Sequence, residues 1–249
     1  MARVLNFGSV ASLEIDGKEV VGHLFIFDID GTLASFAGIT GKAFNRTFQE
    51  LHGQPGPWGK VLPHGRTDRM ILRECFAVAG VDGDFDAHFK LFIESYLCNL
   101  REAFQTMTGA RVLPGVIELL NRLDADSSAF LALGTGNVER AARMKLEHLG
   151  LNPFFPVGGF GDNAEERKEA IADAVQNATR HYQRSFAPEL SWVIGDTPYD
   201  IEAGQALGLR TLAVATGGLH TYQDLRRAAP DLVFENLSDT QFVVKSLGL

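Results

Sequence analysis

The segment from Phe25 to Leu33 constrains the fold of this chain more than any other stretch. It reads Phe-Ile-Phe-Asp-Ile-Asp-Gly-Thr-Leu, so an apolar, strand-like run ends in two carboxylates, Asp28 and Asp30, and a glycine. The glycine indicates a turn just past the strand, which places both aspartates at the strand's carboxyl end. In a parallel α/β sheet, ligands bind at that edge. The alternative is an acidic turn without function, because Asp-Gly is a common turn dipeptide.

In the second half of the chain, short apolar strands alternate with helical patterns. This alternation predicts a parallel sheet with helices on both faces, a doubly wound α/β fold. We expect strands near residues 24–28, 130–133, 191–194, 211–214 and 232–234, and helices near 114–123, 138–149, 164–182, 198–207, 221–229 and 238–247.

Residues 34–110 have a different character, with apolar residues at helical spacing and no convincing strand. This block predicts an all-helical insert above the end of the first strand. The chain therefore divides into an α/β core, residues 1–33 and 111–249, and a helical domain, residues 34–110. Before the first strand, residues 11–21 alternate around Asp16-Gly17, which predicts a hairpin; we assign no chemistry to residues 1–23.

Composition excludes several classes of function. The net charge of -8 argues against nucleic-acid binding, although a local cation can still bind a small anion. No stretch is long enough for a membrane span, and the N-terminus lacks the pattern of a secretory signal, so we expect a cytoplasmic protein. The two cysteines, Cys75 and Cys98, lie in apolar helical patterns and are expected to be buried thiols in a reducing compartment.

A second strand end carries Gly134-Thr135-Gly136-Asn137 directly before a predicted helix. A hydroxyl and backbone N–H groups at a helix N-terminus can bind a phosphate group. The same residues are also typical of a plain helix start, with Asn137 as the cap and the glycines making the turn. The segment alone does not decide between these two readings.

A third strand end carries Asp196 and, four residues later, Asp200. An acidic helix start is common, since the helix dipole favours it. If Asp28, Asp30 and Asp196 converge, however, they repel each other unless a cation lies among them. Their oxygen ligands suit Mg²⁺, which also binds phosphate oxygens.

A positive charge for an anionic substrate can come from Arg167 or Lys168, near the start of the helix predicted at 164–182. A cation there opposes the helix dipole, which favours a functional interpretation for one of them. Adjacent helical residues point in different directions, and we favour Arg167 as the inward one. The other residue is expected to be solvated.

Taken together, the ordered motifs resemble those of the haloacid dehalogenase superfamily. They are Asp28-Ile-Asp30-Gly-Thr-Leu, then Thr135, then Arg167/Lys168, then Gly195-Asp196-x-x-x-Asp200. The resemblance covers nearly all of residues 24–235, and the helical block 34–110 matches the position of the family's helical cap. The chain looks most like the phosphoglycolate phosphatase branch, which implies a Rossmann-like core.

The resemblance implies a role for each of these residues in a Mg²⁺-dependent phosphatase acting on a small phosphomonoester. Asp28 is then the nucleophile that forms an aspartyl-phosphate, and Asp30 protonates the leaving group and activates water. The phosphoryl group is held by Thr135, the Gly136 amide and Arg167, and Mg²⁺ by Asp28, the Asp30 carbonyl and Asp196, with Asp200 in support. Family members mostly carry lysine in the third motif, so Arg167 departs from the pattern.

The same fold also hosts other functions. Haloacid dehalogenation is disfavoured because the dehalogenases that the chain resembles keep no carboxylate at the position of Asp30. A β-phosphoglucomutase-like phosphotransferase uses the same core. A phosphonatase needs a cap lysine that forms a Schiff base, and only ordinary lysines, Lys42, Lys60 and Lys90, are present there. A non-catalytic binding module on the same fold is a further alternative, disfavoured by the intact acidic residues.

The sequence indicates the substrate only as a small phosphorylated metabolite. In the insert, Arg66 is a candidate substrate contact, although an ion pair with Asp68 or another neighbour explains it equally well. Trp58 is expected either to line the pocket or to pack the insert. We expect no nucleic-acid or membrane partner, and a monomer or a homodimer.

Overall fold

The computed structural model describes residues 13–15, 18–20 and 22–249. The predicted hairpin is confirmed, because β1 (Leu13–Ile15) pairs antiparallel with β2 (Lys18–Val20). Its expected turn, Asp16-Gly17, lies outside the described residues. In the described part of the chain, no helix combines the length and the apolar character needed to cross a bilayer.

The predicted α/β fold is confirmed by a six-stranded parallel sheet in the order β10-β9-β8-β3-β6-β7. From the central strand the chain builds first toward β6 and β7, then continues on the other side through β8. Such a reversal of direction creates a crevice at the carboxyl ends of the strands. The strands are β3 (His23–Phe27), β6 (Ala129–Gly134), β7 (Gly158–Gly159), β8 (Ser191–Gly195), β9 (Arg210–Val214) and β10 (Leu232–Phe234).

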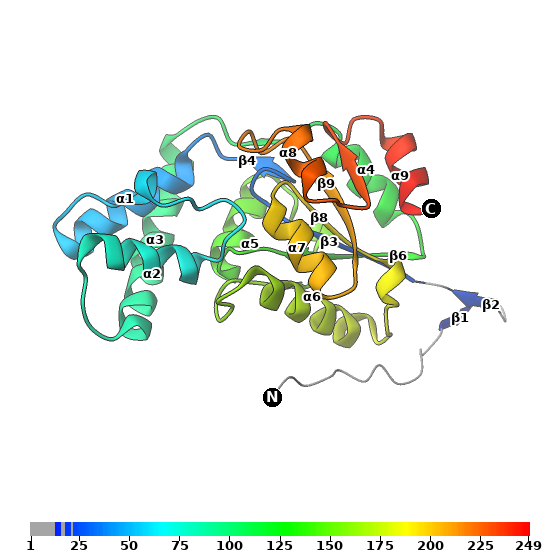
Figure 1. Ribbon diagram of the computed structural model, residues 1–249, viewed down its shortest axis with the longest axis horizontal. Coiled ribbons are helices and arrows are strands. Elements are labelled where there is room, and N and C mark those ends of the chain that lie inside the picture. Colours follow the sequence, from blue (N-terminus) through cyan, green and yellow to red (C-terminus); the bar gives the residue numbers. More distant parts are fainter. Residues whose placement is uncertain (1–12, 16–17, 21) are drawn as a thin grey trace.

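Helices cover both faces of this sheet (Figure 1). Because successive strand residues point to opposite faces, Phe25 and Phe27 pack in one apolar cluster, with residues of α4, α5 and α9, and Leu24 and Ile26 in another, with residues of α6 and α7. Both faces are therefore buried. The helices are α4 (Val116–Asp124), α5 (Glu139–His148), α6 (Arg167–Tyr182), α7 (Pro198–Ala206), α8 (Tyr222–Arg227) and α9 (Thr240–Leu247).

The insert forms a helical body beside the sheet, drawn in blue to green in Figure 1. Its helices are α1 (Ile39–His52), α2 (Asp68–Ala79) and α3 (Phe85–Thr106), with a 3-10 turn at Trp58–Lys60. Aromatic residues fill the space between them: the Phe44 ring lies 4.7 Å from that of Phe92 and 4.8 Å from that of Trp58. Contacts of this kind stabilise a small core beyond the area they bury.

Several details differ from the sequence predictions. The insert begins with a strand, β4 (Ala34–Ser35), which pairs with β5 (Arg111–Val112), so the two linkers form a short ribbon. The helix expected from residue 114 begins at Val116, because Gly115 has a left-handed φ of 81° that breaks the helical turn. Cys98 is exposed and only Cys75 is buried, since position 98 lies on the outer face of α3.

Candidate active site

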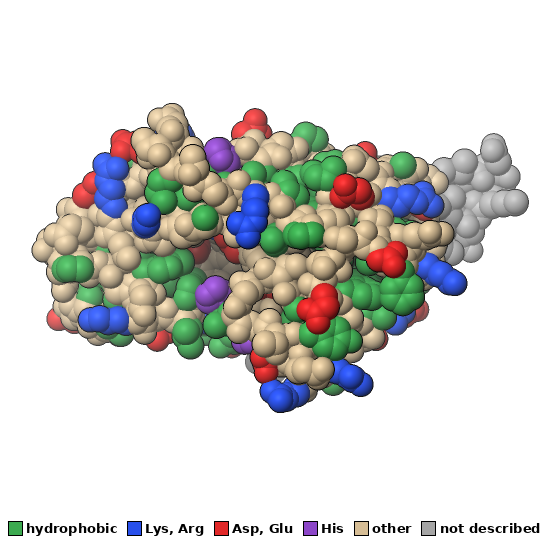
Figure 2. All heavy atoms as spheres, turned by 90° about the horizontal axis from the view of Figure 1, so that it is seen from above, with side chains coloured by type: hydrophobic (Ala, Val, Ile, Leu, Met, Phe, Trp, Pro, Cys, Tyr) green, Lys and Arg blue, Asp and Glu red, His purple; other side chains and the backbone are tan. Residues whose placement is uncertain are grey.

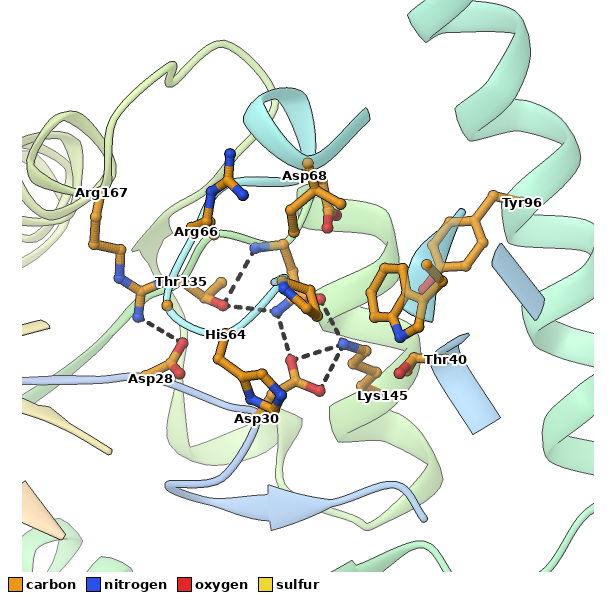
Figure 3. Close-up of a pocket in the computed structure, with 16 residues that line it drawn as sticks. Asp28, Asp30, Thr40, His64, Arg66, Asp68, Tyr96, Thr135, Lys145 and Arg167 are labelled. Carbon is orange, nitrogen blue, oxygen red and sulfur yellow. Dashed lines mark hydrogen bonds and ion pairs between the residues drawn. The ribbon is translucent and has the colours of Figure 1, made fainter. Parts of the chain in front are cut away.

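A cavity of about 130 Å³ lies between the carboxyl edge of the sheet and the insert. Figure 2 shows the corresponding hollow, with acidic side chains inside it. Most of the predicted site residues line the cavity, and the insert contributes the opposite wall (Figure 3). The lining includes, from the prediction, Asp28, Asp30, Thr135, Gly136, Arg167 and Arg66, and in addition Thr40, Trp58, His64, Asp68, Tyr96, Asn137 and Lys145.

Asp28 directly continues β3, since its N–H donates to the Ile194 carbonyl at 2.9 Å. Its carboxylate is buried and belongs to a cluster with Asp196 and Asp200, in which one oxygen of each lies within 4.8 Å of the others. Burial, reinforced by Asp200 and Asp30, raises the pKa of Asp28 to about 6 although Arg167 opposes the shift. Burial also raises the pKa of Asp196 well above its ordinary value, with contributions from both neighbouring aspartates.

Arg167 points inward and forms ion pairs with two aspartates of this cluster. Its Nη2 lies 2.7 Å from Asp28 Oδ1 and 2.6 Å from Asp200 Oδ1. Burial alone lowers the pKa of a guanidinium, but Asp200 and Asp28 outweigh it and hold the pKa of Arg167 above its ordinary value. The buried Nε of Arg167 has no hydrogen-bond partner among the described residues. Lys168 instead points outward, half exposed, and pairs with Glu166.

The aspartates of the cluster are not equivalent. Both oxygens of Asp200 are engaged, Oδ1 by Arg167 and Oδ2 by the N–H and hydroxyl groups of Thr197, at 3.1 and 2.7 Å. From the described part of the chain, the Asp196 side chain receives one hydrogen bond, from the Thr32 hydroxyl to Oδ1 at 3.2 Å. Asp28 and Asp196 are therefore better able to bind a cation than Asp200. Among the described residues, Arg167 is the one cation that acts on these three carboxylates, so this set of oxygen donors fits Mg²⁺.

Asp30 lies in a different environment, on the cavity side of the turn. Lys145 Nζ contacts both of its oxygens, at 2.9 and 2.7 Å, and Asn137 Nδ2 donates to Oδ2 at 2.7 Å. Asn137 also donates to the Thr135 hydroxyl oxygen, from Nδ2 at 2.8 Å and from its main-chain N–H at 3.3 Å. Because the Thr135 oxygen accepts both bonds, its own hydrogen can be donated to a phosphoryl oxygen.

The insert docks directly on the loop after β6. The Asp68 N–H donates to the Gly136 carbonyl at 2.8 Å, and the Val138 N–H donates to Asp68 Oδ2 at the same distance. The fit requires glycine at 136, because a Cβ there would lie 2.0 Å from the Arg66 carbonyl oxygen. Burial raises the pKa of Asp68 to about 6, opposed by the nearby Lys145.

Arg66 lines the cavity and also forms an ion pair with Glu74, at 2.5 Å, rather than with Asp68. Lys145 and Asp68 were not among the site residues predicted from sequence, and Asn137 was expected only as a helix cap. For Lys145 a signal was present, because it interrupts the buried stripe of α5 that contains Ala141 and Leu146. For Asp68, which looked like an ordinary first-turn acid of α2, there was none.

Comparison with known proteins agrees with this architecture. Residues 25–214 match the family model described as haloacid dehalogenase-like hydrolase. This match spans most of the chain, which therefore belongs to that family. The chain is an enzyme of the hydrolase class, as the ordered motifs predicted.

Individual relatives support the same branch of the family. A phosphoglycolate phosphatase of Agrobacterium fabrum is 27% identical over 223 residues, which cover 86% of this chain and 89% of the relative. CbbY from Rhodobacter sphaeroides in complex with phosphate has the same fold, with a TM-score of 0.69, 19% identity and coverage of 92% and 100%. The predicted resemblance to phosphoglycolate phosphatase-like hydrolases, and with it the class of phosphoric monoester hydrolase, is confirmed.

Proposed function

We propose that this protein is a Mg²⁺-dependent phosphatase that hydrolyses a small phosphomonoester through an aspartyl-phosphate on Asp28. One observation carries the proposal: a buried carboxylate held by Arg167 and a solvent-facing carboxylate, Asp30, open into the same small cavity beside Thr135. A nucleophile and a proton carrier are the two groups that this reaction requires.

In the first step, an oxygen of Asp28 attacks phosphorus while the bond to the leaving oxygen breaks. Asp30 gives its proton to that oxygen. In the second step, Asp30 takes a proton from water, which attacks the aspartyl-phosphate and releases phosphate and free Asp28. Thr135 and Arg167 donate to the phosphoryl oxygens throughout, and the unpaired Nε of Arg167 supports this assignment.

Asp28, Asp196 and the Asp30 carbonyl would hold Mg²⁺, with Asp200 fixing Arg167 from behind. When bound, the ion supplies positive charge to the phosphoryl group. We further propose that residues 34–110 act as a cap domain on the core formed by residues 1–33 and 111–249, closing the cavity against water. Arg66 is the proposed contact to the leaving group from that side.

The size of the cavity favours a small substrate. About 130 Å³ is well below the 300–1,000 Å³ that is common for ligand pockets. Among phosphoglycolate, sugar phosphates and nucleotides, phosphoglycolate is therefore the first candidate, and it is also the substrate named for the curated relative. A nucleotide is the least compatible with this volume.

A screen of phosphorylated metabolites with and without Mg²⁺ tests the proposal. We expect Mg²⁺-dependent phosphate release, which EDTA abolishes and added Mg²⁺ restores, with two- and three-carbon esters ahead of nucleotides. Transfer of phosphate between sugar positions without net release would favour the mutase alternative. Absence of turnover with every ester would instead favour a binding module.

A further inference from the structure

Lys145 is a charged residue in a place that normally takes an apolar one. Its side chain is 3% exposed, on the inner face of α5, and the ring of Phe36 lies 5.3 Å from Nζ. Lysine is almost never fully buried unless it is paired. Here the three ammonium donors have three short contacts, two to the oxygens of Asp30 and one to Asn137 Oδ1 at 2.5 Å.

The burial of the two charged partners is strongly asymmetric. Both residues line the cavity, but the Asp30 side chain is 40% exposed and that of Lys145 only 3%. The carboxylate is therefore more accessible to a substrate than the ammonium group. Figure 3 shows the Lys145 side chain directed at the Asp30 carboxylate. Asn137 joins this pair to the phosphate side of the site, because its Nδ2 donates to both Asp30 and Thr135.

We infer that Lys145, together with Asn137, is a positioning residue that fixes the Asp30 carboxylate for proton transfer to and from the leaving group and water. The inference rests on the proposed function. Proton transfer requires the carboxylate to lie within about 2.6–3.2 Å of the reacting oxygen. An aspartate in a turn otherwise rotates freely, and contacts to both oxygens remove that freedom. Lys145 itself exchanges no proton with the substrate.

An ion pair that serves only the packing of α5 would predict a different pattern of loss. It would affect the enzyme equally whichever substrate is offered. A residue that acts through Asp30 matters only where a proton must be transferred. The basicity of the leaving group therefore distinguishes the two roles.

Acetyl phosphate and ethyl phosphate provide a matched pair of probes. They are similar in size, but acetate can leave without being protonated, whereas ethoxide needs a proton in order to leave. For Lys145→Met, we expect kcat/KM to fall about 100-fold with ethyl phosphate and less than about 3-fold with acetyl phosphate. With acetyl phosphate, kcat and KM should fall together, because hydrolysis of the aspartyl-phosphate becomes slow when Asp30 no longer activates water.

Two further comparisons connect this effect to Asp30. Asp30→Asn should show the same dependence on the leaving group, and the double variant Asp30→Asn/Lys145→Met should lose no more than Asp30→Asn alone. Lys245→Met, on the exposed face of α9, is the matched control and should equal the wild type with both esters. Lys145→Gln and Asn137→Ala are tested beside Lys145→Met. Melting curves for all three variants show whether each one folds, so that the result does not depend on the folding of a single variant.

Equal losses of kcat/KM with both esters, or additive losses in the double variant, would overturn the inference while leaving the phosphatase intact. A folded wild type that hydrolyses neither ester nor any other phosphomonoester would overturn the proposed function, and the inference with it. The predicted leaving-group dependence, shared by Asp30→Asn and absent from Lys245→Met, would support both.

Discussion

The two carboxylates of the turn after β3 are separated by one residue, yet their environments are opposite. The Asp28 side chain is 7% exposed, shares a guanidinium with Asp200, and has a pKa raised to about 6 by burial. The Asp30 side chain is 40% exposed and faces a lysine of its own. One short turn thus provides both a buried, charge-crowded carboxylate and a carboxylate open to the cavity.

The backbone accounts for this difference. Asp28 still hydrogen-bonds to the sheet through Ile194, so its side chain remains beside the ends of β3 and β8. Asp30 has left the sheet and forms a bridge with Ala34, at the beginning of the insert. On a continuing strand, residues two apart would share one face and one environment. The turn that Gly31 allows, with φ at 86°, gives the two aspartates separate surroundings.

The largest expected effect comes from replacing the buried member of the pair. Asp28→Asn should lower kcat/KM by at least about 10⁴-fold, since loss of a nucleophile leaves only binding and electrostatic stabilisation. Phosphate release from the preferred ester, measured at saturating Mg²⁺, checks this. Activity close to the wild type would contradict the assignment of Asp28 as nucleophile.

The same substitution should increase stability. Because the pKa of Asp28 in the folded state lies above its ordinary value of 3.8, the folded state binds the proton more tightly, and stability falls as pH rises from about 4 to 6. Above pH 6 the ionised carboxylate is a burden that asparagine removes. In EDTA at pH 8, Asp28→Asn should melt above the wild type, a direction opposite to that of its activity.

The next largest effect is expected from replacing Arg167, the cation of the buried cluster. Arg167→Met should reduce kcat/KM by about 10²- to 10³-fold, as expected for a lost donor to the phosphoryl group. Arg167→Lys keeps the charge and should stay within about 10-fold of the wild type. Lys168→Met should not change activity, because Lys168 is half exposed and pairs with Glu166. If Lys168→Met proved the more harmful change, the outward position of Lys168 would be contradicted.

The buried side of this comparison was the more predictable from sequence. Asp28, Asp196 and Thr135 follow apolar strands, and the carboxyl ends of parallel strands share one edge. Local patterns were therefore enough to bring them together. β7 was not predicted, because its two residues are glycines, which strands disfavour.

The surroundings of Asp30, the more exposed aspartate, were harder to predict because they depend on contacts between elements that are distant in the sequence. Lys145 contacts Asp30, which lies 115 residues earlier in the sequence. Its position in an apolar stripe is the only sequence signal that indicates a special role. For Asp68 and Tyr96, helical periodicity predicts α2 and α3 but not which ends of these helices face the core. The docking of Asp68 on the Gly136 carbonyl contributes to that orientation, and no local pattern encodes this contact.

A smaller effect is expected where the insert touches the core. Gly136→Ala places a methyl group 2.0 Å from the Arg66 carbonyl oxygen, so the insert must move away. We expect a loss of about 10-fold in kcat/KM, mainly through KM, with melting lowered by a few degrees. Kinetics and thermal melting check this. Gly53→Ala, at the C-terminal end of α1 where a Cβ meets no other atom, is the control: it should affect melting but not KM. An unchanged KM would show that this contact does not shape the cavity.

The smallest effect concerns Asp68, which shares the raised pKa of Asp28 but lies outside the buried aspartate cluster. Its pKa of about 6 in the folded state, against 3.8, means that stability is lost as pH rises from about 4 to 6. Two pKa units correspond to about 3 kcal/mol at most. Asp68→Asn keeps an oxygen for the Val138 N–H and removes the charge.

The variant should therefore melt about 5 °C above the wild type at pH 8 and much closer to it at pH 4.5. Asp82→Asn, an exposed substitution in the same insert, should show no such dependence on pH. A gain for Asp68→Asn that is equal at both pH values would mean that the carboxylate carries no penalty in the folded state. In that case low exposure alone would not be sufficient to raise the pKa of a carboxylate. The difference between Asp28 and Asp30 would then depend on the neighbouring carboxylates of Asp196 and Asp200 in the buried cluster.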